Sequence, residues 1–215
     1  MTTTENKLNP STGPTNEPII LIVDDDPHIR ASLTDMFRSV DMETAAYGST
    51  GELLGAGFPD RPACLILDLR LPGGSGLELQ SRLAEMGVAI PIVFLTGHAD
   101  VPTSVRAMKA GAVDFLPKPF REQELLDAVA NALKHDTARR AADLELTQVR
   151  ALAESLTPRE RDVLRGVARA LLNKQIAYEL GIAEMTVKMH RSSAGRKLQT
   201  VSIADMISKI RLLNL

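Results

Sequence analysis

Five short apolar runs, separated by stretches of helical periodicity, constrain the fold of this 215-residue chain more than any other feature. The runs are rich in β-branched residues and bounded by turn residues, and they lie at 19–23, 42–47, 63–68, 91–96 and 112–116. Apolar residues recur every three or four positions in the intervening stretches, at 29–40, 75–86, 103–110 and from 122 onward. Alternating strands and helices of these lengths predict a doubly wound α/β fold with a five-stranded parallel sheet.

Polar side chains stand at the carboxyl ends of these predicted strands. They are Asp24 and Asp25 after the first, Asp68 at the end of the third, Thr96 at the end of the fourth and Lys118 after the fifth. Because the carboxyl ends of parallel strands share one edge of a sheet, we expect these side chains to converge. Clustered carboxylates suit a hard divalent cation such as Mg²⁺, while a lysine and a threonine can contact phosphoryl oxygens.

Four motifs carry a resemblance to a known family. They are VDDD at 23–26, LILDLRLPG at 65–73, FLTGHAD at 94–100 and DFLPKPF at 114–120. In this order and at these separations, the motifs resemble the receiver domain of bacterial two-component response regulators, over residues 18–137. The resemblance implies the flavodoxin-like version of the doubly wound fold, and it implies that a partner sensor histidine kinase transfers a phosphoryl group to Asp68.

The same resemblance implies a role for each polar residue at this edge. The residues that match the family's Mg²⁺ ligands are Asp24, Asp25, Asp68 and the backbone carbonyl of Arg70. Thr96 and Lys118 match the groups that contact the phosphoryl oxygens, and Phe115 matches an aromatic side chain that turns inward on activation. Attack by a carboxylate on a phosphoryl group brings anions together, and a cation with a lysine offsets that repulsion.

Simpler roles compete at three positions. Asp26 precedes Pro27, and this order favours an N-cap over a third metal ligand. His98 lies in a loop, where a solvated or structural role is favoured over a phosphoryl contact. Phe115 is equally consistent with a plain core residue.

A long helix is predicted between two domains. The pattern from Glu122 contains no glycine or proline until Pro158, so it predicts the receiver's last helix continued by a helical linker at 138–151. The receiver-facing stripe of this helix comprises Leu125, Leu126, Val129 and Leu133. The polar segment 1–17 is predicted to be a disordered tail.

The C-terminal part of the chain has the pattern of a small all-α domain. Residues 155–215 contain eleven Lys and Arg against five Asp and Glu, so they carry +6 while the rest of the chain carries −8. Thr157, Pro158 and Glu160 form a capping-box helix start, and four short helices with a turn between the middle pair predict a helix-turn-helix. An apolar stripe in the last helix can be core or a dimer face, and it comprises Ile203, Met206, Ile207 and Ile210.

The motifs LTPRERDVL, NKQIAYELGI, TVKMHR and RKL resemble the LuxR-type output domain of response regulators of the FixJ/NarL class, over residues 152–215. This resemblance implies that a recognition helix starting near Glu184 enters the major groove of double-stranded DNA. The residues it turns toward bases are Lys188, Met189 and Ser192. Those it turns toward phosphates are Thr186, His190, Arg191, Arg196 and Lys197, with Asn173 and Lys174 on the preceding helix.

Four departures from the family pattern predict a weaker recognition helix. Ala183 stands where a serine N-cap is usual, which costs about 1 kcal/mol. Ala170 replaces a glycine, Ala194 replaces a large aliphatic residue, and Gly195 lies inside the helix at a cost of about 1 kcal/mol relative to alanine. DNA binding is still favoured, with greater dependence on dimer formation or on stabilisation of the helix by the DNA itself.

The sequence therefore predicts a cytoplasmic transcriptional response regulator, not an enzyme. Activation is expected either to release an inhibitory contact between the two domains or to favour a homodimer through the receiver. No segment has the length and apolarity of a membrane span, and Cys64, the single cysteine, is predicted to be a buried packing residue. One alternative is a phosphorylation-independent or scaffold regulator that has lost DNA binding. Another is a phosphatase or phosphotransferase that uses Asp68 on small substrates, which the short loops disfavour.

Overall fold

The computed structural model describes residues 17–72, 74–97 and 101–215, and it divides the chain into two compact units with a boundary between Arg139 and Arg140. This boundary falls inside the predicted linker, 138–151, so that its first two residues belong to the N-terminal unit and the rest to the C-terminal unit. The predicted tail lies outside the described residues, except for its last position. Within the described ranges, no helix is both long enough and apolar enough to cross a membrane.

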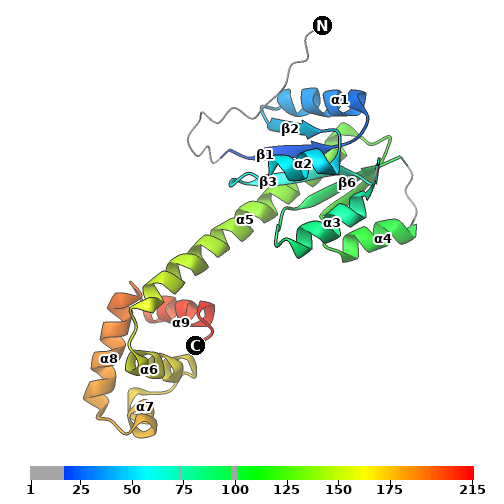
Figure 1. The fold of residues 1–215 in the computed structure, drawn as a ribbon. Helices are drawn as coiled ribbons and strands as arrows, with labels where there is room; N and C mark the ends of the chain where they lie inside the picture. The colour runs from blue at the N-terminus through cyan, green and yellow to red at the C-terminus, as the bar shows by residue number, and fades with distance from the viewer. Residues whose placement is uncertain (1–16, 73, 98–100) are drawn as a thin grey trace. The chain divides into compact units, whose positions relative to one another are not determined.

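The N-terminal unit is built on a parallel five-stranded sheet of order β2-β1-β3-β6-β7 (Figure 1). The strands are β1 Ile19–Val23, β2 Glu43–Tyr47, β3 Ala63–Asp68, β6 Ile92–Thr96 and β7 Asp114–Pro117. The helices are α1 Pro27–Arg38, α2 Thr50–Ala56, α3 Gly76–Glu85, α4 Val101–Lys109 and α5 Glu122–Glu154. This is the doubly wound, flavodoxin-like fold that the sequence predicts.

Helices cover both faces of this sheet. On one face, residues such as Leu21 and Leu65 pack against α2, α3 and α4, and on the other Ile22 and Ile66 pack against α1 and α5. Strands that are buried on both faces must be apolar throughout, which explains why β1 and β3 read as continuous runs. The predicted stripe of α5 is confirmed, since Leu125, Val129 and Leu133 are buried and Leu126 is partly buried against the same core.

Three elements lie outside the stretches expected from the sequence: one helix and two short strands. Helix α2 is short, and the Ser49 hydroxyl caps it by accepting a hydrogen bond from the amide of Glu52 at 3.2 Å. Directly after Asp68, β4 Arg70–Leu71 pairs with β5 Gly74–Ser75 in a small antiparallel ribbon. Strand β7 also begins two residues later than expected, because the Ala112 amide donates to Ala107 and completes the end of α4.

The C-terminal unit contains α6 Pro158–Ala168, α7 Asn173–Leu180, α8 Glu184–Lys197 and α9 Ile203–Leu212, packed with the end of α5. The predicted capping box is present, since Thr157 and Glu160 exchange backbone and side-chain hydrogen bonds at the start of α6. The apolar stripe of α9 is mainly core: Met206 and Ile210 are buried, Ile207 is partly buried, and Ile203 is exposed.

The unusual residues of this unit have distinct local effects. Ala170 adopts a left-handed conformation with φ 58°, and Ala183 provides no side-chain cap for α8, as predicted. Gly195, however, lies where α9 comes close: a Cβ there would be 3.0 Å from both Met206 Cε and Thr200 Oγ1. The glycine therefore makes room for packing, which offsets part of its intrinsic cost in a helix, and Ala194 beside it is fully buried.

Candidate functional site

The register of the sheet brings the predicted acidic residues together. Strand β1 pairs with β3 up to Val23 and Leu67, so Asp24 and Asp68 are the next residues on adjacent strands. Asp68 in turn pairs with Leu95, one residue before Thr96, and Thr96 pairs with Pro117. Main-chain pairing alone thus gathers residues from four segments at one edge.

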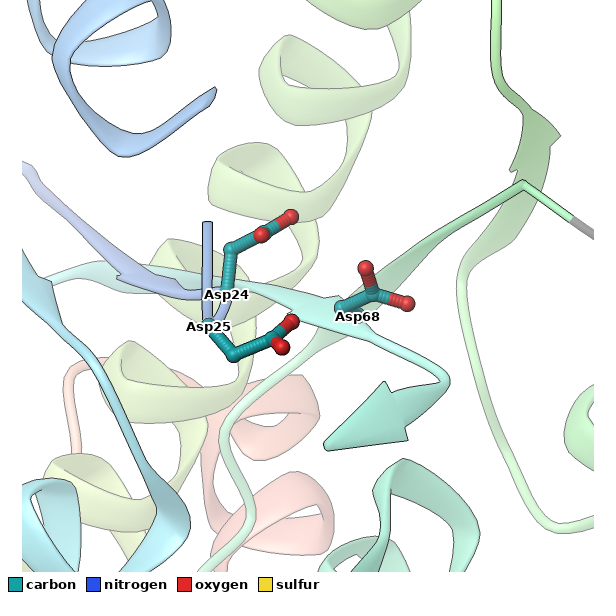
Figure 2. Close-up of side chains that lie close together, drawn as sticks. All are labelled: Asp24, Asp25 and Asp68. Carbon is teal, nitrogen blue, oxygen red and sulfur yellow. The ribbon is translucent and has the colours of Figure 1, made fainter. Parts of the chain in front are cut away.

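Three carboxylates form a cluster at this edge (Figure 2). Asp24, Asp25 and Asp68 each offer an oxygen, and these oxygens lie within 4.8 Å of one another. Asp24 is 2% exposed and Asp68 is 9% exposed, whereas Asp25 is exposed. Oxygen ligands at this separation fit a Mg²⁺ ion, with Asp25 on the solvent side.

Lys118 holds two of the carboxylates. Its Nζ donates to Asp24 Oδ2 at 2.5 Å and to Asp68 Oδ2 at 2.7 Å. The other oxygens accept backbone hydrogen bonds, Asp24 from the amide of Asp26 at 2.9 Å and Asp68 from the amide of Arg70 at 3.0 Å. The single positive charge of the lysine ammonium therefore offsets part of the negative charge of a nearly buried carboxylate pair.

Burial and hydrogen bonding shift the pKa values of Asp24 and Lys118. It raises the pKa of Asp24, although the hydrogen bond from Lys118 opposes the shift. For Lys118, burial alone would lower the pKa, but the hydrogen bonds to Asp24 and Asp68 raise it overall. The lysine therefore stays protonated and positively charged beside the Asp68 carboxylate.

The turn after Asp68 depends on a residue that the sequence did not single out. A Cβ on Gly76 would lie 2.5 Å from the backbone oxygen of Asp68 and 3.0 Å from Phe94 Cε1. Next to it, Ser75 and Glu78 form a capping box that begins α3. The Ser-x-x-Glu spacing was the available signal, whereas the close approach at Gly76 is visible only in three dimensions.

The remaining predicted residues of this edge occupy the expected places. Thr96 is fully buried at the end of β6, where its backbone carbonyl accepts a hydrogen bond from the amide of Lys118 at 2.7 Å. Phe115 is half-buried on β7 and stands opposite Phe94, with ring centroids 6.1 Å apart. Asp26 caps α1 by accepting from the amide of His28, which confirms the simpler of its two roles. His98 lies outside the described residues.

A second candidate site lies on α8 in the C-terminal unit. The exposed predicted DNA-contacting residues are Lys174, Lys188, Met189, Ser192 and Arg196. Those half-buried are Asn173, Thr186, His190, Arg191 and Lys197. Arg191 donates to Asn173 Oδ1 at 3.2 Å, which ties α8 to the start of α7. The surface is thus polar, with Met189, 66% exposed, as an apolar side chain available to a base.

Lys197 differs from the other predicted phosphate contacts. Its Nζ donates to Glu160 Oε2 at 2.7 Å and to the carbonyl of Ser155 at 2.9 Å. Glu160 is 3% exposed and also accepts from the Ser193 hydroxyl at 2.7 Å. This lysine neutralises a buried carboxylate inside the domain, so we leave it out of the proposed DNA surface. Sequence reasoning assigned Glu160 only a capping role.

Known proteins match both units of this chain. The response regulator receiver domain matches residues 20–130, and the bacterial regulatory proteins of the luxR family match residues 154–210. Nodulation protein W of Bradyrhizobium diazoefficiens is 52% identical over 189 residues, which cover 88% of this chain and 83% of that protein. The response regulator protein TmoT of Ectopseudomonas mendocina is 42% identical over 191 residues, which cover 89% of this chain and 87% of that protein.

A solved structure of a response regulator also resembles this chain over most of its length. The structure of the response regulator StyR aligns with a TM-score of 0.77 at 46% identity, covering 91% of this chain and 98% of that chain. The fold and the acidic edge define a receiver, and the C-terminal helices define a helix-turn-helix. This chain belongs to the two-component response regulators that join a receiver domain to a LuxR-type DNA-binding domain.

Proposed function

We propose that Asp68 accepts a phosphoryl group from a sensor histidine kinase and that this modification controls sequence-specific binding of α8 to double-stranded DNA. The observation that carries the first half is the convergence of Asp24, Asp25 and Asp68 with Lys118 at one edge of the sheet. In the transfer, a carboxylate oxygen of Asp68 forms a bond to phosphorus as the bond from phosphorus to the kinase's imidazole nitrogen breaks.

The acidic cluster supports Mg²⁺ as the cofactor. Its ligands would be Asp24, Asp25, Asp68 and the backbone carbonyl of Arg70, and the ion would neutralise the charge that accumulates between carboxylate and phosphoryl oxygens. Lys118 lies 2.7 Å from Asp68, so its ammonium can move from the carboxylate to a phosphoryl oxygen. Thr96 would offer its hydroxyl to a second oxygen from the adjacent strand.

The negative charge of the phosphoryl group would change the conformation of the receiver. A phosphoryl group brings about −1.5 to −2 charges to Asp68, which would draw Lys118 and Thr96 toward it. These residues stand at the ends of β7 and β6, so the change would reach α4 and Phe115. We propose that the altered receiver surface favours a homodimer, because two copies of the helix-turn-helix would double the phosphate contacts with a two-fold DNA site. Since this function needs a kinase and chromosomal DNA, we place the protein in the cytoplasm.

Mass spectrometry of the intact protein tests the first half directly. The wild type and Asp68→Asn are incubated with Mg²⁺ and acetyl phosphate, and a gain of one phosphoryl group is expected in the wild type alone. An equal gain of mass in Asp68→Asn would show that Asp68 is not the phosphoryl acceptor. If neither protein gains mass, the same pair is incubated with a purified kinase domain, and failure there as well would reject phosphorylation of this receiver.

Selection from a random duplex library tests the second half. The phosphorylated protein should enrich a two-fold sequence motif, and unphosphorylated protein should retain it more weakly in a mobility shift. A scaffold regulator that has lost DNA binding would enrich no motif in either state. Equal binding by both states would support a phosphorylation-independent regulator.

A further inference from the structure

Two methionines are exposed on one side of α8. Met185 and Met189 are four residues apart, so they are neighbours on the helix surface, and each is 66% exposed. Helix α8 packs into the core of the C-terminal unit through other residues, among them Val187 and Ala194, and neither methionine contributes to that core. Packing within the domain therefore does not explain why these two positions carry large apolar side chains.

The rest of this exposed side of α8 is polar. Lys188, Ser192 and Arg196 are exposed at three- or four-residue steps along the helix, so they form one stripe with the two methionines. Lys188 also pairs with Glu184 of the same helix at 3.2 Å. Within α8, which the structure describes completely, the two methionines are the only large apolar residues that are exposed. Any apolar contact made by this stripe must therefore come from them.

The charge of this stripe favours DNA over a second copy of the chain as its partner. In a contact between two copies through α8, Lys188 and Arg196 of one copy would lie close to the same basic residues of the other, and like charges repel. DNA phosphates instead attract these side chains. The eleven Lys and Arg against five Asp and Glu in residues 155–215 act in the same direction.

Thymine is the base that offers an apolar group in the major groove. Its C5 carbon carries a methyl group, whereas the groups that identify guanine, adenine and cytosine there are hydrogen-bond donors and acceptors. The methionine side chain is flexible and polarisable, so it packs well against a methyl group, and its sulfur is only a weak acceptor for polar base edges. Methionines on a helix in this groove would thus favour thymine over the other bases.

We propose that Met185 and Met189 read thymine, each by packing against the 5-methyl group of one thymine in the major groove. This inference rests on the proposed entry of α8 into DNA, and it adds the base that two positions of the site must carry. Sequence reasoning gave Met185 no role. The helix rises about 6 Å between the two methionines, and successive base pairs are about 3.4 Å apart. The two thymines should therefore lie within about two base-pair steps of each other.

Replacement of thymine by deoxyuridine tests the proposal, because it removes the methyl group and leaves every hydrogen-bonding group of the base in place. The phosphorylated full-length protein is titrated with the duplex obtained by selection, and each thymine of one half-site is replaced in turn. At two nearby positions we expect binding to weaken by about two- to fivefold, which is the effect of removing one buried methyl group. Replacement of the other thymines should have no effect.

Two variants assign each methionine to a base. Met185→Ala and Met189→Ala should each lose the preference for thymine over deoxyuridine at one of the two positions and keep it at the other. Both residues are exposed, so the melting temperature of each variant should match that of the wild type. Val201→Ala is the control, since Val201 is a 92% exposed apolar residue that lies outside α8. This variant should keep both preferences.

Three results would overturn the inference. They are a selected motif without two thymines at this spacing, unchanged affinity when any thymine is replaced by deoxyuridine, and methionine variants that keep the preference of the wild type at every position. A protein that enriches no motif would instead reject the proposed DNA binding, and this inference with it. The two failures are therefore distinguishable, because only the first three results leave sequence-specific DNA binding in place.

Discussion

The α-carbon of Gly76 packs directly against the backbone carbonyl of Asp68, so closely that a Cβ at residue 76 would lie 2.5 Å from that oxygen. Real Cβ atoms do not come so near a backbone oxygen, so any side chain there must displace the end of β3 or the start of α3. The position of Asp68 is thus set partly by a residue that has no side chain.

Gly76→Ala should therefore damage both stability and function. The added methyl group overpacks a rigid backbone contact, and we expect the free energy of unfolding to fall by about 1–3 kcal/mol. Phosphorylation of Asp68 by acetyl phosphate should slow as well, because its backbone must shift. Urea denaturation measures the first effect and the time course of mass gain measures the second.

Gly74→Ala is the matched control for this change. A Cβ there would meet Glu78 Oε2 at 3.3 Å, and this carboxylate can shift by a few tenths of an ångström while it still accepts the hydrogen bond from the amide of Ser75. Gly74→Ala should stay close to the wild type in both measurements. If the two alanine variants lost similar stability, the close approach at Asp68 would not be the cause.

Lys118 acts as the internal counter-ion of the acidic edge in the absence of metal. Replacing it by methionine leaves two nearly buried carboxylates uncompensated, so we expect Lys118→Met to unfold at a lower temperature without Mg²⁺. A divalent cation restores positive charge to the same place, and the rise in melting temperature on adding Mg²⁺ should be larger for Lys118→Met than for the wild type. Differential scanning calorimetry with and without Mg²⁺ gives both quantities.

Lys109→Met controls for the loss of a lysine elsewhere in the receiver, since this residue is exposed at the end of α4. Its melting temperature should respond to Mg²⁺ as the wild type does. An equal response in all three proteins would mean that Lys118 does not compete with a cation at Asp24 and Asp68.

The sequence predicts the receiver well because its main signals are one-dimensional. Continuous apolar runs identify β1 and β3, and in a parallel sheet the residues that follow such strands must meet at one edge, so Asp24, Asp68 and Lys118 could be brought together in advance. Helix α2 shows the limit of this reasoning. Seven residues are too few for a helical period to stand out, and its start depends on the hydroxyl of Ser49.

Other features depend on contacts between distant residues, which no local pattern contains. Gly195 lowers helix stability when α8 is considered alone. The fold favours a glycine there because Met206 and Thr200 from the following segment leave little space for a Cβ. Lys197 fits a phosphate-contact motif, yet a buried Glu160 from α6 holds its ammonium. Gln80 gives no sequence signal at all: its Oε1 is buried without a hydrogen-bond partner among the described residues, and only the packing around α4 determines this.

Lys197 and its neighbour Arg196 should differ in their effect on DNA binding. Arg196 is exposed, and its removal should take away one phosphate contact, so the slope of log affinity against log salt should fall by about 1 in Arg196→Ala. Lys197→Ala should leave that slope unchanged and instead lower the stability of the domain, because Glu160 loses its partner. Titration of a selected DNA site at several salt concentrations measures the slope, and thermal unfolding measures stability. A reduced slope in Lys197→Ala would restore this residue to the DNA surface.

Glu160 gives the C-terminal unit a defined dependence on pH. Burial alone would raise the pKa of its carboxyl, but the ion pair with Lys197 and the hydrogen bonds from Ser193 and Thr157 lower the pKa to about 2. In the unfolded chain the same group titrates near 4.5. The folded state thus holds the charged form more tightly, and this contribution to stability is complete above pH 4.5 and disappears as the pH falls toward 2.

Glu160→Gln should remove that dependence. At neutral pH we expect the variant to be less stable by about 1–3 kcal/mol, since the hydrogen bonds to a charged acceptor are lost. The difference from the wild type should shrink as the pH is lowered from 5 to 3, because only the wild type loses a favourable charge in that window. Asp162→Asn, at a partly exposed carboxylate of the same helix that pairs with Arg165, controls for the loss of an acidic side chain from α6. Urea denaturation across this range makes the comparison, and a stability difference that stays constant with pH would show that packing, and not the charge of Glu160, joins α6 to α8.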